Sequence, residues 1–274
     1  MEKEIMDGKT ITEKAMNLID ERHKTKETCT GITSGFLYLD QMTLGFQNSD
    51  LIIIGSKPDV GKTALALSMI HNIAIGNKIP CGLLSLEESC ATIGVQLLSQ
   101  IAEVNLQKIN HGLLNEDELR KINDSAEKLS DSPVYISDIP GLNFSKLSEL
   151  AKCMVKENNT KILFIDYLNL IETENSGCSC YDARSKIAVS LKNLAKELCF
   201  PIVVLCQISR DSKKINPNIE QTSDILLYLQ RNEGKKFASS PEAKIIVAKN
   251  NHGSLGKFFV NFNQECYRFT DEKY

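Results

Sequence analysis

Short apolar runs alternate with segments of helical spacing along most of this chain. Buried strands are predicted where a mainly apolar run is bounded by polar residues or turn signals. These runs are residues 51–54, 81–86, 133–137, 161–166, 201–206 and 224–229. Helices are predicted where apolar positions recur every three to four residues, at 64–75, 89–101, 116–129, 145–157 and 183–198. The alternation predicts an α/β fold, a mostly parallel twisted sheet with helices on both faces.

The pattern changes near the C-terminus, where two strands follow one another without a helix between them. They are predicted at 243–248 and 257–262, with a turn around Asn250 to Gly256. Consecutive strands with a short connection pair in antiparallel fashion, so the sheet is expected to end in an antiparallel edge.

The first 27 residues are polar and charged except for one apolar stripe at helical spacing. Its members are Ile11, Ala15, Met16, Leu18 and Ile19. A lone amphipathic helix is predicted, and its apolar side packs either on its own domain or on a neighbouring subunit. We therefore expect a linker helix and lead-in over residues 1–28 and one α/β domain over residues 29–274.

Composition excludes several classes of protein. The chain has 274 residues, 42% hydrophobic and 24% charged, which is typical of a soluble globular protein. No apolar run reaches the ~18–20 residues of a membrane span, and the charged N-terminus is unlike a signal peptide. Nine cysteines occur without a CxxC pair, so free thiols in a reducing, cytoplasmic setting are expected.

The net charge of −3 excludes the broad basic surface that coats duplex DNA. A narrow basic channel for a single strand is compatible with that charge, because local charge can differ from the average.

The clearest chemical signal lies where the strand at 51–54 runs into a loop closed by Gly-Lys-Thr. Strand, loop and following helix are typical of a phosphate-binding P-loop. The predicted ATP-binding residues are Ser56, Lys57, Pro58, Asp59, Val60, Gly61, Lys62 and Thr63. Lys62 would reach the terminal phosphates, and the Thr63 hydroxyl would bind Mg²⁺. The alternative is a chance Gly-Lys-Thr on a surface turn, which the strand and helix on either side argue against.

This loop departs from the GxxxxGK[ST] pattern at one position. Ser56 stands where the pattern has its first glycine, and Gly55 lies one residue too early.

A second candidate is Asp166, which ends the apolar run that begins at Lys161. A carboxylate at the C-terminal end of a buried strand can hold the Mg²⁺ water shell beside the phosphates. The alternative is an Asp that caps the next turn. Together with the P-loop, the pattern favours Thr63 and Asp166 as the metal site.

Further motifs occur on both sides of the P-loop. In chain order they are Thr30-Gly31-Ile32-Thr33-Ser34-Gly35-Phe36 with Leu39-Asp40, Gly45-Phe46-Gln47, Asp50-Leu51-Ile52-Ile53, Ser85-Leu86-Glu87, Ile165-Asp166-Tyr167-Leu168-Asn169-Leu170, Leu191-Lys192-Asn193-Leu194-Ala195-Lys196-Glu197-Leu198, Leu205-Cys206-Gln207-Ile208-Ser209-Arg210, Ile219-Glu220-Gln221 with Asp224, and Ala248-Lys249-Asn250 with Gly253 and Gly256. In this order they resemble the ATPase domain of DnaB-type replicative helicases. That family also carries a small residue at the first P-loop position.

The resemblance implies a RecA-like core in a ring, a homo-hexamer with ATP between subunits. It implies Mg²⁺-dependent ATP hydrolysis coupled to movement on single-stranded DNA in replication, with primase or a helicase loader as partner. Catalytic roles fall on Lys62, on Glu87 as general base and on Gln207 as sensor of the γ-phosphate. Arg210 and Lys249 are implied as further ATP contacts.

Two of these roles have open alternatives. Glu87 is otherwise an N-cap of the next helix, a position that Glu88 also fits. Gln207 is otherwise a satisfied polar residue at the end of a strand.

The sequence departs from the family in three places. The position of the family's finger arginine, two residues after its last lysine, is Asn251 here, and Arg210 or Arg231 is a conceivable substitute. The segment between Arg210 and Asn218 is short, which leaves Lys213 and Lys214 as DNA-binding candidates or as a solvated pair. A primase-binding N-terminal domain has no counterpart in these residues, as expected of a trimmed chain or a short form from a mobile element.

Two hypotheses follow for the function. The first is a DnaB-type helicase ATPase domain. The alternative, favoured by Asn251 and the short segment, is a nucleotide-binding scaffold or helicase paralogue with weak ATPase activity and no unwinding. A recombinase-like or KaiC-like protein is a third class, which the Ile219-Glu220-Gln221 and Lys249-Asn250 stretches argue against.

Overall fold

One mixed sheet organises the protein. A computed structural model describes residues 6–25, 29–171, 180–209, 212, 214–231 and 242–272. Within these residues the sheet has nine strands, in the order β3-β2-β4-β5-β1-β6-β7-β8-β9. Their bounds are β1 Leu51–Ser56, β2 Cys81–Ser85, β3 Val134–Ser137, β4 Ile162–Asp166, β5 Ile202–Gln207, β6 Ile225–Arg231, β7 Glu242–Asn250, β8 Gly256–Asn263 and β9 Arg268–Asp271. The strands from β3 to β6 are parallel, and those from β6 to β9 are antiparallel.

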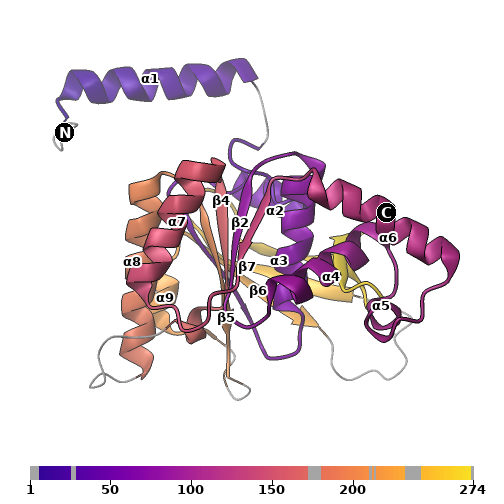
Figure 1. Ribbon diagram of the computed structural model, residues 1–274. Helices are drawn as coiled ribbons and strands as arrows, with labels where there is room; N and C mark the ends of the chain where they lie inside the picture. Colours follow the sequence, from indigo (N-terminus) through magenta and orange to yellow (C-terminus); the bar gives the residue numbers. More distant parts are fainter. Residues whose placement is uncertain are drawn as a thin grey trace.

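Helices cover both faces of the sheet (Figure 1). On one side lie α2 (Leu37–Thr43), α3 (Lys62–Ile70), α4 (Cys90–Ala102), α5 (Leu106–His111) and α6 (Glu116–Ser130), and on the other α7 (Phe144–Asn158), α8 (Cys180–Leu198) and α9 (Pro217–Thr222). The prediction of a mostly parallel sheet with two helical layers and an antiparallel C-terminal edge is confirmed.

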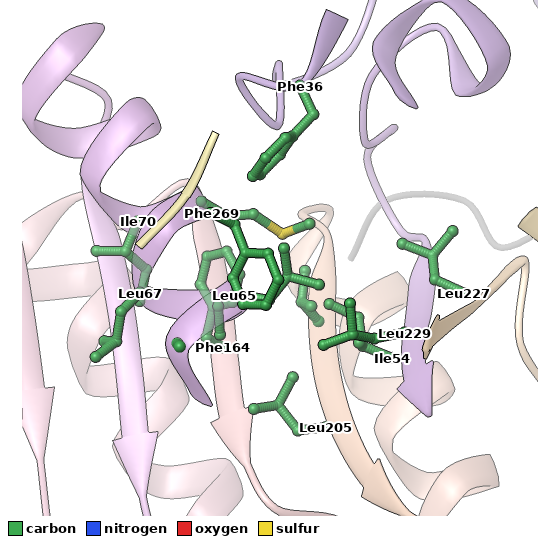
Figure 2. Close-up of a cluster of buried hydrophobic side chains, with 14 of the residues drawn as sticks. Phe36, Ile54, Leu65, Leu67, Ile70, Phe164, Leu205, Leu227, Leu229 and Phe269 are labelled. Carbon is green, nitrogen blue, oxygen red and sulfur yellow. The ribbon is translucent and has the colours of Figure 1, made fainter. Parts of the chain in front are cut away.

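The core is built on both sides of each central strand. In β1, Ile52 and Ile54 pack on the α3 side, whereas Leu51 and Ile53 pack on the α8 side, and all four are fully buried. Figure 2 shows the first side, where Leu65 of α3, Ile54 of β1 and Phe269 of β9 belong to one buried cluster. Because both faces are buried, these strands are continuous apolar runs in the sequence, and that is why they were predictable.

The differences between prediction and structure lie in short or boundary elements. Helices α2, α5 and α9 and strand β9 were not predicted, and α8 begins at Cys180 instead of residue 183. Helix α3 continues as a π-helical turn, His71–Gly76, so the single helix predicted to residue 75 changes its hydrogen-bonding pattern partway. The three helices have only six or seven residues and the strand only four, which is too short for a periodic pattern to be recognised.

Helix α1 (Gly8–Thr25) stands apart from the sheet body (Figure 1). Four members of its apolar stripe are exposed: Ala15, and Ile11, Met16 and Ile19, which are each 50–56% exposed. The predicted amphipathic helix therefore forms, and it does not bury its apolar side on its own domain.

Two expectations from composition can be compared with the structure. Within the described part of the chain no disulfide joins two cysteines. The helices of the same part are each too short or too polar to cross a membrane.

Strand registers bring several polar residues to one edge of the sheet. Ser56 at the end of β1 pairs with Gln207 at the end of β5, and Ser85 at the end of β2 pairs with Asp166 at the end of β4. Parallel strands end at the same edge, so residues far apart in sequence meet there.

Candidate nucleotide-binding site

A tight loop connects β1 to α3 at this edge. Gly61, with a φ of 104°, is the N-cap of α3, and Asp59 also adopts a left-handed conformation. The first N–H groups of a helix have no partner within the helix, so the start of α3 presents donors and a partial positive charge to an anion. The Ser56 hydroxyl, which stands where the motif has glycine, is buried and donates to the Lys57 carbonyl at 2.8 Å.

The first two residues of α3 carry the cation and the hydroxyl that the motif predicts. Lys62 is 9% exposed. The Thr63 hydroxyl donates to Asp166 Oδ2 at 2.6 Å and so joins the P-loop helix to the end of β4. The predicted phosphate-binding turn and the predicted magnesium carboxylate are therefore in direct contact.

Burial shifts the pKa values of Lys62 and Asp166. Desolvation lowers the pKa of Lys62, an effect that the charges of Asp166 and Glu87 oppose. Desolvation also raises the pKa of Asp166 to about 6, although the hydrogen bond from Thr63 lowers it. Because burial disfavours the charged forms of Lys62 and Asp166, a bound ligand that brings opposite charge to each of them would stabilise those forms.

Asp166 also presents an oxygen atom that is suited to binding a cation. Its Oδ1 is buried and has no hydrogen-bond partner among the described residues. Buried polar atoms without a partner are rare in native proteins, and a carboxylate oxygen beside a threonine hydroxyl is the kind of ligand that Mg²⁺ accepts next to phosphate. Thr63 and Asp166 therefore fit a magnesium ion.

The two acids after β2 are held differently. Ser89 is the N-cap of α4 and accepts from the Thr92 N–H, so the alternative that Glu87 or Glu88 caps this helix is wrong. Glu88 is half-buried and accepts a hydrogen bond from Gln96 Nε2 at 2.7 Å. Glu87 is exposed, and its charge acts on both Lys62 and Asp166.

A cavity of about 320 Å³ lies over these groups. The lining residues that the sequence predicted are Pro58, Asp59, Gly61, Lys62, Thr63, Glu87 and Gln207. Gln207 is half-buried at the end of β5, beside the P-loop strand. The remaining predicted loop residues lie outside the lining: Ser56 and Val60 are buried, and Lys57 is exposed.

Known proteins share this combination of motifs and geometry. A family model for the DnaB-like helicase C-terminal domain matches residues 31–271. The chain belongs to this family. The replicative DNA helicase DnaB of Treponema pallidum is 34% identical over 271 residues, 96% of this chain and 61% of that protein. The replicative DNA helicase DnaC of Bacillus subtilis is 33% identical over 270 residues, 92% of this chain and 59% of that protein.

Solved structures agree with the family. One of them, a separately solved ATPase domain, superposes with a TM-score of 0.90 at 27% identity, covering 98% of this chain and all of that domain. A DnaB-like replicative helicase, solved in a study of its interactions with primase, superposes with a TM-score of 0.86 at 26% identity, covering 95% of this chain and 66% of that one. The chain has the RecA-like core of these ATPase domains, and it spans about three fifths of the length of the curated relatives.

Two other residues predicted from the DnaB resemblance, Lys249 and Lys214, are not among the residues that line the cavity. Lys249 donates from Nζ to the carbonyls of Glu220, Gln221 and Ser223, at 2.9, 2.8 and 2.5 Å. Its contact with ATP stays a prediction. The predicted ATP contact of Arg210 and the predicted DNA contact of Lys213 fall outside the described residues. Lys214 is exposed.

Asn251, at the position of the family's finger arginine, is engaged within the chain. Its side-chain amide donates to Asp224 Oδ1 at 3.2 Å, and its N–H donates to the Asp224 carbonyl at 3.0 Å.

One wall of the cavity was missed by sequence reasoning. Phe262 of β8 and Gln264 and Tyr267 of the turn before β9 line it. Arg231 of β6 lies in the same wall, whereas the sequence indicated it only as a conceivable substitute for the finger arginine. The Arg231 guanidinium stacks over the Phe262 ring at 4.5 Å from its centroid and donates to the Asp59 carbonyl at 3.4 Å. Sequence could not reveal this wall, because a turn some 200 residues after the P-loop has no motif that links it to phosphate binding.

The raised pKa of Asp166 predicts how stability depends on pH. The native state binds this proton more tightly than the unfolded chain, so Asp166 reduces the free energy of unfolding as pH rises from about 4 to about 6. The measurement is the free energy of unfolding in urea, without nucleotide or Mg²⁺. Relative to that of the native chain, the free energy of unfolding of Asp166→Asn should rise by up to ~3 kcal/mol between pH 4 and pH 7.5.

The matched control for this measurement is Asp131→Asn, which removes an exposed carboxylate at the end of α6. It should follow the native curve at every pH. A difference between Asp166→Asn and the native chain that stays constant from pH 4 to 7.5 would contradict the burial argument.

Proposed function

We propose that this chain is the motor core of an ATP-dependent DNA helicase of the DnaB type, acting in DNA replication. The observation that carries the proposal is the meeting of Lys62, Thr63, Glu87, Asp166 and Gln207 at one edge of the sheet. Together they provide groups that bind phosphate, two ligands for a metal ion, a carboxylate that accepts a proton from the attacking water, and a polar contact to the γ-phosphate.

The substrate in this proposal is ATP with Mg²⁺. The start of α3 and Lys62 bind the phosphates, while Thr63 and Asp166 hold the ion. When bound, Mg²⁺ neutralises charge that develops on the phosphate oxygens. The wall of Arg231, Phe262 and Tyr267 places aromatic side chains and a planar cation beside the space that we assign to the nucleoside.

Glu87 is the group we assign as general base. It is exposed to the cavity, whereas the carboxylate of Glu88 is engaged by Gln96. A base must be able to reach the attacking water and accept its proton, and the side chain without such a tether suits that task. Gln207 then contacts the γ-phosphate from the end of β5.

Assembly into a homo-hexameric ring completes the proposal. The exposed apolar stripe of α1, which finds no partner on its own domain, supports docking on a neighbouring subunit. Primase or a helicase loader is the further protein partner, and single-stranded DNA passes through the ring. Lys213 and Lys214 are the residues we assign to its phosphates.

One specific observation favours the second candidate function, a nucleotide-binding scaffold with weak ATPase activity. The Lys249 ammonium already donates to three carbonyls, and Asn251 binds Asp224. Neither offers a cation to a neighbour's phosphates in this arrangement. In other NTPases a missing arginine finger costs ~10³–10⁵ in rate. DNA-stimulated turnover with strand separation supports the motor, and binding without turnover supports the scaffold.

Two substitutions separate nucleotide binding from hydrolysis. Lys62→Ala should weaken ATP binding and lower kcat/KM by ~10²–10³, because the cation beside the phosphates is removed. Glu87→Gln should keep ATP affinity and lower kcat by ~10²–10⁴, because only the proton acceptor is removed. Steady-state hydrolysis and fluorescent-nucleotide binding measure both, and unchanged turnover in Lys62→Ala would refute the site.

DNA binding is tested by the salt dependence of affinity. The double variant Lys213→Ala/Lys214→Ala should reduce the slope of log K against log salt for oligo-dT by ~1.4, about 0.7 for each phosphate that is no longer neutralised. The matched control, Lys156→Ala/Lys161→Ala, removes two exposed lysines, one near the end of α7 and one just before β4, and should leave the slope unchanged. An unchanged slope in the test variant would make the lysine pair a solvated surface feature.

Assembly is tested on α1. Ile11→Glu with Ile19→Glu should shift the chain to smaller species in sedimentation velocity with a non-hydrolysable ATP analogue and oligo-dT, because charges replace the apolar stripe that the assembly buries. Lys14→Glu, a charge change at an exposed position of the same helix, is the control. If the double variant assembles like the native chain, α1 is not the docking element.

A further inference from the structure

The hydrogen bond between Glu88 and Gln96 is a feature of the cavity that the proposed function does not use. Both side chains are half-buried, both line the cavity, and Gln96 Nε2 donates to Glu88 Oε2 at 2.7 Å. The backbone of Glu88 is fixed as well, since the Ser85 hydroxyl donates to its carbonyl at 2.6 Å and accepts from its N–H at 3.3 Å. Among the described residues, the hydrogen bond that holds the Glu88 carboxylate is the one from Gln96.

The charges around Glu88 make its direction important. Burial and the neighbouring charge of Glu87 raise the pKa of Glu88, and the hydrogen bond from Gln96 opposes both effects. The cations that line the same cavity are Lys62 and Arg231. A carboxylate in this position without its amide donor would be driven towards those cations, because a half-buried charge without a partner is costly.

We infer that Gln96 is a positioning residue, which holds the Glu88 carboxylate against α4 and so keeps it off Lys62 and out of the space for the terminal phosphates. This inference rests on the proposed function, since it assigns the cavity to ATP. Gln96 acts only through Glu88 and touches no reacting atom. Without its amide, Glu88 turns into the cavity, pairs with Lys62 and competes with the triphosphate.

The inference predicts that the Glu88 carboxylate and ATP compete for Lys62 when the Gln96 amide is removed, which changes ATP affinity and not kcat. Gln96→Met removes the donor at nearly constant size. We expect Mg-ATP to bind about tenfold more weakly, with kcat at saturating ATP within about twofold of native, because bound ATP displaces the carboxylate. Gln96→Lys keeps a donor at this position and should restore most of the affinity.

The decisive variant is the double substitution Glu88→Gln/Gln96→Met. It removes the competing charge, so ATP affinity should return to within about twofold of native. If Gln96 only supported the fold, changing Glu88 would not repair the defect. Gln107→Met, an exposed glutamine on α5, is the matched control and should bind ATP like the native chain.

Three outcomes are informative, each read by isothermal titration with Mg-ATP beside thermal unfolding. A weakened Gln96→Met that the double variant rescues supports the inference. If Gln96→Met binds ATP like the native chain, or if its defect persists in the folded double variant, the inference is overturned, whereas the proposed function stands as long as Lys62→Ala binds ATP more weakly than the native chain. If Lys62→Ala binds ATP like the native chain, the proposed function itself fails. Should Gln96→Met unfold, Gln96→Asn, which draws the amide back by one methylene, gives the same comparison.

Discussion

The hydrogen bond from Thr63 to Asp166 is the interaction on which the site depends. It joins residues 103 positions apart, the start of the P-loop helix and the end of β4, across the edge of the sheet. The bond is possible only because β1 and β4, with β5 between them, run parallel and end together. The sheet therefore brings residues that are far apart in sequence together at the candidate phosphate and metal site.

This compact arrangement buries charged side chains, and burial disfavours their charged forms. Lys62 and Asp166 are both driven towards their neutral forms by burial, and Glu87 and Glu88 add further negative charge nearby. Each acid has a different environment: one bound to a threonine, one bound to an amide and one exposed. The three carboxylates are therefore distinguished by their surroundings, although they lie near one another.

Much of this arrangement was predictable from sequence, and the rest has physical reasons for being hidden. The strands of the parallel sheet were predictable because burial on two faces leaves continuous apolar runs, and Lys62, Thr63 and Asp166 were predictable because they end or follow such runs. The aromatic wall at Phe262 and Tyr267 was not, since it depends on β8 and β9 folding back beside α3. The three hydrogen bonds of Lys249 were hidden too, because a lysine's partners are set by tertiary packing.

The segment between β5 and α9 is held firmly at its two ends. The Ile208 N–H donates to the Ser56 carbonyl at 2.9 Å, and the Ile215 N–H donates to the Tyr228 hydroxyl at 3.1 Å. Helix α9 is in turn capped from β7 by Lys249. Anchors of this kind let evolution lengthen or shorten the intervening stretch at small entropic cost, leaving the frame unchanged. The short segment in this chain therefore changes the surface that the proposed ring offers to single-stranded DNA. It does so without a change in the candidate nucleotide-binding site.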